Sequence, residues 1–185
     1  PVGVATIDPV GGHVEFYRLG AQPAWIQRVW SETTTEDWIG WWGRYQLGWW
    51  NSLLGQREVK ILSGIDGPDV FLVNGRDGNL YWFGTVSNPG TDTSMVGYML
   101  TDVRTGTFTF HETPGYYNDL GAAQNVHQNP EVAKAPDLEV VQPIMYVIDN
   151  QEVWIIPVIT PSGEQTLVGL VEARSGTTYI GPSLQ

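Results

Sequence analysis

Four short segments of this chain recur in the same order roughly 70 residues further on, and this internal repeat constrains the fold more than any other feature. The paired segments are 70–74 with 145–149, 80–86 with 152–158, 95–98 with 167–170, and 103–110 with 173–180. A sequence repeat of this kind is typical of one structural unit used more than once. We therefore expect both stretches to adopt the same backbone.

The repeated stretches are rich in β-branched and aromatic residues and are divided by turns that contain glycine, asparagine or proline. This pattern predicts short antiparallel strands joined by hairpins. The predicted fold class is α+β, with two repeated units, each a helical segment followed by a four-stranded antiparallel β-meander. The predicted domains are an N-terminal β-hairpin over 1–20, resembling the tail of a preceding unit, a first unit over 21–114, and a second over 115–185.

The helical segments are predicted from local signals. Residues 23–30 suggest a short helix with a proline in its first turn, and residues 38–54 suggest a longer one, which we expect to be capped by Thr33 with Glu36 or by Thr34 with Asp37. The second unit is expected to contain a helix over about 120–128 and a short one after Pro130, which cannot lie in a helix interior.

Seven of the nine tryptophans lie between residues 25 and 50, most of them inside the longer predicted helix. Because tryptophan is highly buried on average, a helix packed across the sheets is the favoured interpretation. The alternative is a partly exposed aromatic surface that binds a protein partner, since tryptophan is enriched in binding hot spots. The candidate partner-binding residues are Trp38, Trp41, Trp42, Tyr45, Trp49 and Trp50.

Charge and composition argue against several functions. The net charge of −11 repels phosphate backbones, so we expect no binding to nucleic acid. The chain has no cysteine, and its three histidines lack the spacing of a zinc site. No nucleophile elbow or phosphate-binding loop is present. We therefore predict no enzymatic activity, no catalytic residue, no metal site and no cofactor.

Two matched segments carry a resemblance to a known family. Residues 101–107 read TDVRTGT and residues 171–177 read VEARSGT, the latter after the strand sequence VWIIPV. Over about half of the chain this resembles tandem copies of the PepSY type of extracytoplasmic domain, which places a helix before a small antiparallel sheet. The tryptophan-dense first helix departs from the family pattern. The resemblance implies a non-catalytic domain outside the cytoplasm that binds or restrains another protein.

The function predicted from the sequence is that of a non-enzymatic interaction or regulatory domain, the extracytoplasmic part of a larger envelope or membrane protein. Its partner is expected to be another protein, and any membrane attachment is expected to lie in residues outside this chain. A structural assembly protein of a virion or surface layer is one alternative, because edge strands can pair between subunits. A carbohydrate-binding module that uses exposed tryptophans is the other.

Overall fold

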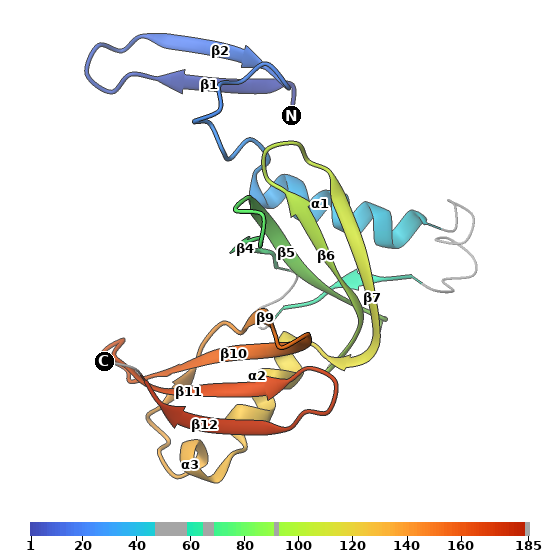
Figure 1. Ribbon diagram of the computed structural model, residues 1–185, viewed down its shortest axis with the longest axis vertical. Helices are drawn as coiled ribbons and strands as arrows, with labels where there is room; N and C mark the ends of the chain where they lie inside the picture. Colours follow the sequence, from blue (N-terminus) through green and yellow to red (C-terminus); the bar gives the residue numbers. More distant parts are fainter. Residues whose placement is uncertain (47–58, 65–68, 91–92, 184–185) are drawn as a thin grey trace.

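The computed structural model describes residues 1–46, 59–64, 69–90 and 93–183, in which three antiparallel sheets and three helices follow one another along the molecule (Figure 1). The N-terminal hairpin consists of β1 (Gly3–Ile7) and β2 (Val14–Arg18). The middle sheet consists of β3 (Ile61–Leu62), β4 (Phe71–Asn74), β5 (Leu80–Ser87), β6 (Ser94–Asp102) and β7 (Phe108–Tyr117). The C-terminal sheet consists of β8 (Glu139–Val140), β9 (Ile144–Ile148), β10 (Gln151–Ile159), β11 (Gln165–Glu172) and β12 (Thr178–Pro182).

The predicted fold class is wrong. Strands make up 44% of the described residues and helices 16%, so this part of the molecule is mostly β rather than α+β, and it has three sheets rather than two helix-plus-four-strand units. Each large sheet has five strands, because the two-residue strands β3 and β8 add to β5 and β10. A pairing this short has no hydrophobic periodicity of its own, which is why the sequence gives no sign of it.

The two large sheets have corresponding strand orders. The middle sheet runs β3-β5-β6-β7 with β4 also on β5, and the C-terminal sheet runs β8-β10-β11-β12 with β9 also on β10. The helices are α1 (Glu32–Tyr45), α2 (Asp119–His127) and α3 (Pro130–Ala133). The last two confirm the helices expected near 120–128 and after Pro130. The helix expected over 23–30 is wrong, since this stretch consists of turns and irregular chain.

One turn geometry closes three of the hairpins, including the N-terminal one. In each, an acidic residue accepts a hydrogen bond at its carbonyl from the N–H of a glycine four residues later, at 2.8 to 2.9 Å. The acidic and glycine pairs are Asp8 with Gly12, Asp102 with Gly106, and Glu172 with Gly176. Each glycine has a φ between 67° and 74°, a conformation that costs glycine little. An acidic residue followed by glycine four positions later is thus a local sequence signal for this turn.

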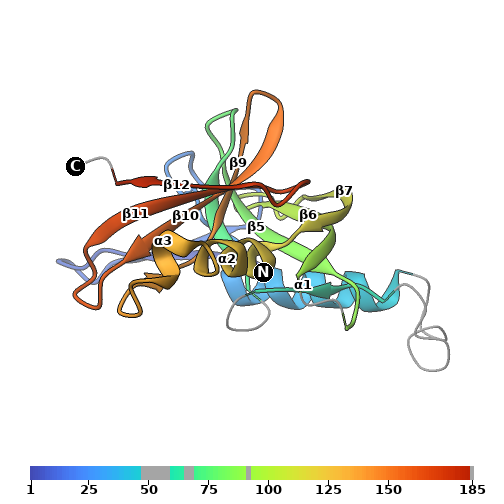
Figure 2. The ribbon, with the colours of Figure 1, turned by 90° about the horizontal axis from the view of Figure 1, so that it is seen from below.

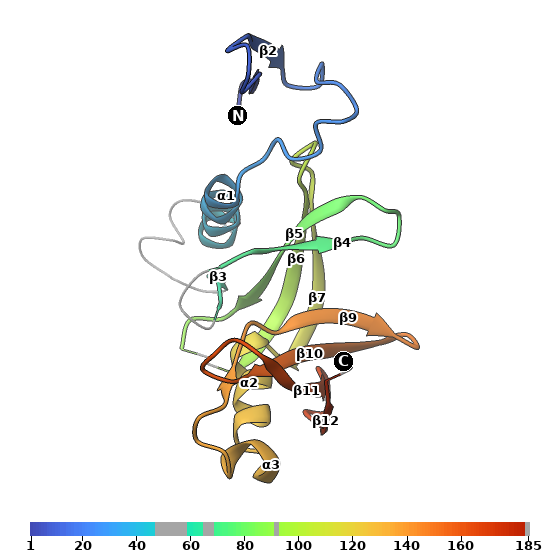
Figure 3. The same ribbon diagram turned by 90° about the vertical axis from the view of Figure 1, so that its left-hand side faces the viewer.

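Both faces of the middle sheet are covered. On one face α1 encloses Leu62, Trp82 and Met99, and on the other Phe83 joins the cluster that holds Trp154 beneath α2. The last six residues of β5 are accordingly all buried, without the alternation of a half-exposed strand. Figure 3 shows α1 beside the middle sheet, and Figure 2 shows α2 and α3 on one face of the C-terminal sheet.

None of the helices in the described ranges has the length and hydrophobicity that crossing a bilayer requires.

Candidate functional site

The helix α1 carries most of the predicted binding residues and begins earlier than its sequence suggests. Ser31 is the N-cap, and its Oγ accepts a hydrogen bond from the N–H of Thr34 at 3.3 Å. The expected caps, Thr33 and Thr34, therefore lie inside the first turn. The reason is that Ser31 is itself a good N-cap and has Thr34 at the spacing the bond requires. The described part of the helix ends at Tyr45.

The buried face of α1 is narrow and is built from small or branched side chains: Thr35, Ile39 and Gly43. Gly43 lies directly against the chain that leads into β3, because a Cβ atom at this position would be 2.2 Å from the carbonyl oxygen of Lys60. The N–H of Lys60 also donates to the carbonyl of Gly43 at 3.0 Å. This close approach explains one of the helix glycines. Gly40 has open space around it and plays no such part.

Three aromatic side chains form a contiguous exposed stripe on α1, which we call the α1 aromatic surface: Trp38, Trp41 and Tyr45. Their exposed fractions are 44%, 57% and 41%. Their spacing of i, i+3 and i+7 places them on one side of the helix. The ring of Trp38 packs edge-on against the buried Trp30, with 5.5 Å between ring centroids, and lies 6.3 Å from the ring of Trp41. The surface is thus anchored to the core at one end.

Trp42 turns away from this stripe toward the middle sheet. It is half-buried and packs on Phe110, with ring centroids 4.9 Å apart. The ammonium group of Lys60 lies 5.4 Å from the Trp42 ring centroid and 4.6 Å from that of Phe110. Trp42 is therefore a packing residue with a cation over its ring. The other two candidates, Trp49 and Trp50, lie outside the described residues.

The favoured expectation that the tryptophan-rich helix is buried is wrong for Trp38 and Trp41, whereas Trp30 is only 8% exposed. The i, i+3 and i+7 spacing puts Trp38, Trp41 and Tyr45 on one side of the helix but does not reveal which side the sheet covers. The sheet covers the neighbouring stripe, because Ile39 and Gly43 allow a closer approach than indole rings would. Trp38 and Trp41 therefore agree with the alternative expectation, a partly exposed aromatic surface.

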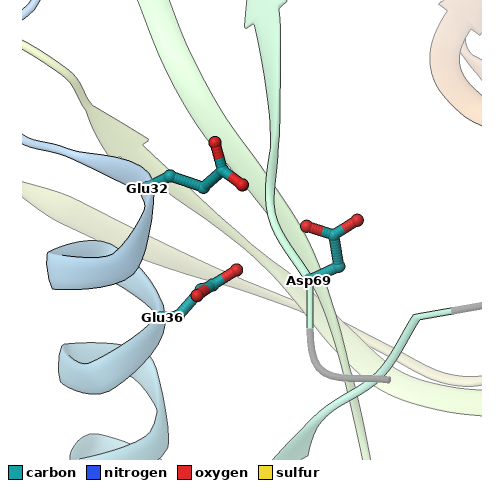
Figure 4. A group of neighbouring side chains, drawn as sticks. All are labelled: Glu32, Glu36 and Asp69. Atoms are coloured by element: carbon teal, nitrogen blue, oxygen red, sulfur yellow. The ribbon is translucent and has the colours of Figure 1, made fainter. Parts of the chain in front are cut away.

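Figure 4 shows a group of three carboxylates between the start of α1 and the chain before β4. Glu32 and Glu36 come from the first two turns of the helix and Asp69 from the chain before β4, and one oxygen of each lies within 4.8 Å of the others. Burial raises the pKa of Glu36, and the negative charges of Asp69 and Glu32 raise it further. Carboxylates so placed could hold a hard cation such as calcium or magnesium.

Two of the three members of this group are related by a local signal in the sequence. The i, i+4 spacing of Glu32 and Glu36 places them on one flank of a helix, but no such spacing relates Asp69 to them. Asp69 reaches these two residues because the chain before β4 lies beside α1, which no local signal predicts.

Comparison of the chain with protein-family models, with curated proteins and with solved structures gave no match. The likeness to PepSY domains remains a prediction.

Proposed function

We propose that this chain is a non-enzymatic protein-interaction domain and that the α1 aromatic surface is where its partner docks. The observation that carries the proposal is the exposure of two tryptophans and a tyrosine side by side on a helix whose neighbouring stripe is core. Tryptophan and tyrosine are enriched among the residues that dominate binding energy. A partner that covered them would bury the part of each side chain that is still exposed, 41% to 57%.

The charges near the surface favour a protein over other partners. Among the described residues of α1, three are acidic and only Arg44 is basic. An interfacial membrane helix normally carries lysine and arginine on its polar face, and a nucleic-acid surface needs the same charges. An apolar groove or helix on a protein has no such requirement and suits exposed indole rings. The location outside the cytoplasm, within a larger envelope protein, is part of this proposal through the family resemblance alone.

The carbohydrate-binding alternative draws on the same two tryptophans. A sugar ring stacks on a flat aromatic face, but the planes of Trp38 and Trp41 are tilted by 42°. They therefore do not form one flat platform for a chain of sugars. A protein partner, which can follow a stepped surface, fits this arrangement better.

The test is a binding measurement on matched exposed variants. A partner captured with the wild-type chain is purified, and its affinity is measured by calorimetry for wild type, Trp41→Ala and Tyr179→Ala. Tyr179 is a matched control because its exposed fraction, 58%, is close to the 57% of Trp41, whereas Tyr179 lies on β12 in the C-terminal sheet. We expect Trp41→Ala to weaken binding by about 2 kcal/mol or more and Tyr179→Ala to have no effect. Equal affinity of all three proteins would exclude the α1 aromatic surface as the docking site.

A further inference from the structure

A cavity of about 660 Å³ lies between the edges of the two large sheets, remote in sequence from α1. One side is lined by β4 and its turn, residues 72–77, and the other by β9, residues 144–147. Consecutive residues line both sides. The face of a strand would contribute only every second residue, so each strand turns its edge toward this space. We call it the β4–β9 cleft.

The edge of β9 that faces the cleft carries unpaired backbone groups. Asp149 and Asn150 both have positive φ and form a two-residue hairpin turn between β9 and β10. Ile148 beside this turn is therefore hydrogen-bonded to β10. Alternation along the ladder then directs the N–H and C=O groups of Val147 and Met145 away from β10. One of these groups is capped by a side chain, because Arg76 Nη2 donates to the carbonyl of Val147 at 3.2 Å.

The edge of β4 is open in the same way. The N–H of Gly75 donates to the carbonyl of Asn79 at 2.8 Å, which fixes the phase of the β4–β5 ladder. By the same alternation, the backbone groups of Leu72 and Asn74 point away from β5. In the described part of the chain β4 pairs with β5 alone and β9 with β10 alone. Two strand edges thus border one cleft.

The floor of the cleft is aromatic and comes from the middle sheet. Phe83 and Tyr98 stack with ring centroids 5.4 Å apart, and His111 stacks on the far side of Tyr98 at 4.8 Å. Leu100 completes the apolar part of the floor. Side chains that alternate along an inserted strand would meet this floor at every second position.

The titratable groups near the cleft are mostly acidic. Asp77, beside Arg76, accepts hydrogen bonds from the hydroxyl of Tyr81 and from Asn79, and the bond from Tyr81 lowers the pKa of its carboxyl. The negative charge of Glu152 acts on Tyr98 in the floor, where burial first and then this charge raise the pKa of the phenol. Among the described lining residues Asp77 is the one carboxylate and Arg76 the one cation, and Arg76 is engaged with the carbonyl of Val147. A ligand with positive side chains matches this environment.

We propose that the β4–β9 cleft binds an extended, basic segment of another protein, which adds as a strand to the free edge of β9. Backbone groups of the segment pair with Met145 and Val147, and the segment displaces the guanidinium of Arg76 from the Val147 carbonyl. Strand addition of this kind takes its affinity from main-chain hydrogen bonds and its specificity from alternate side chains. The proposal uses a different surface from α1 and stands independently of the α1 aromatic surface.

The probes are three synthetic peptides of about six residues, a normal strand length. One alternates lysine with valine, one alternates glutamate with valine, and the third is the lysine peptide with prolines in place of valines, which removes half of its N–H donors. Binding to the full chain is measured by fluorescence anisotropy, and the site is located by hydrogen exchange of the backbone amides. We expect only the lysine–valine peptide to bind and to protect Met145 and Val147.

Two variants test the geometry. Val147→Pro removes an N–H that points away from β10, so the sheet keeps its ladder, and it should weaken the lysine–valine peptide by roughly 3- to 10-fold, the value of one hydrogen bond. Val147→Ala keeps the N–H and should bind within about 2-fold of wild type. Arg76→Ala frees the Val147 carbonyl and should tighten binding.

Equal binding of the lysine and glutamate peptides, unchanged affinity in Val147→Pro, or protection confined to other strands would each overturn the proposal. Trp41→Ala separates it from the proposed function, because this variant should bind the lysine–valine peptide as wild type does. If Trp41→Ala loses its protein partner but still binds the lysine–valine peptide, the result supports a separate site in the β4–β9 cleft. If Trp41→Ala keeps its partner but loses the peptide, the result contradicts that site.

Discussion

The helices α1 and α2 occupy equivalent positions, each against one face of a five-stranded sheet, but they differ in how much of their surface is buried. α2 buries five of its nine residues, most of them small: Asp119, Gly121, Ala122, Ala123 and Val126. α1 buries three of fourteen and leaves Trp38, Trp41 and Tyr45 exposed. Two tryptophans and a tyrosine of α1 thus lie outside the core, whereas α2 contains no phenylalanine, tryptophan or tyrosine. Small residues are sufficient for a helix to approach its sheet closely. The exposed aromatic side chains of α1 are therefore not needed to pack the helix against the middle sheet.

The acidic residues at the two helix N-termini also differ in burial and in hydrogen bonding. Asp119, in the first turn of α2, is 1% exposed, and its carboxylate accepts a hydrogen bond from the hydroxyl of Thr85 at 2.9 Å. At α1 the acidic group formed by Glu32, Glu36 and Asp69 places three carboxylates together, and the described residues form one salt bridge to it, from Arg28 to Glu32 at 3.8 Å. The α2 end is locked into the core, whereas the α1 end holds repulsive charge at the surface.

The largest test of this comparison is the loss of a tryptophan from each environment. Trp154 is completely buried beneath α2 and its Nε1 donates to the carbonyl of Tyr117 at 2.9 Å. We expect Trp154→Ala to lower the free energy of unfolding by about 3–5 kcal/mol, and Trp41→Ala by less than about 1 kcal/mol. Urea denaturation measures both. A loss of more than about 2 kcal/mol in Trp41→Ala would mean that α1 is packed as tightly as α2.

The second test compares two glycines of α1 itself. A Cβ atom at Gly43 would clash with the Lys60 carbonyl, so Gly43→Ala should destabilise the fold by about 1–3 kcal/mol. Gly40 faces open space, so Gly40→Ala should stabilise it by up to about 1 kcal/mol through helix propensity. Thermal unfolding distinguishes the two. If both variants gained stability, the contact between α1 and the chain before β3 would be looser than the structure shows.

A third test compares two buried threonines of the middle sheet. Thr85 faces α2 and donates to Asp119, so Thr85→Val should cost about 1–2 kcal/mol by leaving a buried carboxylate without its donor. Thr101 lies on the α1 face, and its Oγ1 is buried with no hydrogen-bond partner among the described residues. Thr101→Val keeps the shape and should be neutral or stabilising. Chemical denaturation is the measurement, and equal losses in the two variants would contradict the distinction between the two faces.

The smallest effect is expected at the acidic group of α1. The pKa of Glu36 is raised above its ordinary value of 4.5, so the folded state holds its proton more tightly than the unfolded state. Stability from this group is therefore present below about pH 4.5 and is lost as pH rises through the raised pKa. Glu36→Gln should be more stable than wild type by about 0.3–1 kcal/mol near pH 7 and equal to it at low pH.

Asp37→Asn is the matched control for this charge effect. Asp37 is exposed and lies outside the three-carboxylate group, and its negative charge is the smallest of the causes that raise the pKa of Glu36, so its substitution should change the pH dependence much less than Glu36→Gln does. If Glu36→Gln shows the same pH dependence as wild type in urea denaturation, the repulsion at this flank contributes nothing to stability.

Local signals in the sequence were reliable where the structure depends on neighbours along the chain. The helix over 120–128 is confirmed because Asn118 caps it through the N–H of Gly121 at 2.8 Å, only three residues away. The predicted cap of α1 was wrong because Ser31, Thr33 and Thr34 are all suitable N-cap residues within a few positions of one another. The strands β3 and β8 were missed because two residues are too few to show a hydrophobic pattern. The fold class failed for this second reason, and helices are also a smaller part of the described residues than expected.

The sequence by itself determined the hairpin turns, the Asn118 cap of α2 and the periodicity that puts three aromatic residues on one side of α1, because each depends on atoms within about one turn of helix or hairpin. Only the tertiary structure decided that this side faces solvent, that Asp69 joins Glu32 and Glu36, and that the edges of β4 and β9 border one cleft. These features depend on which distant segments fill a given space, and packing between them is settled by the shapes of both partners together.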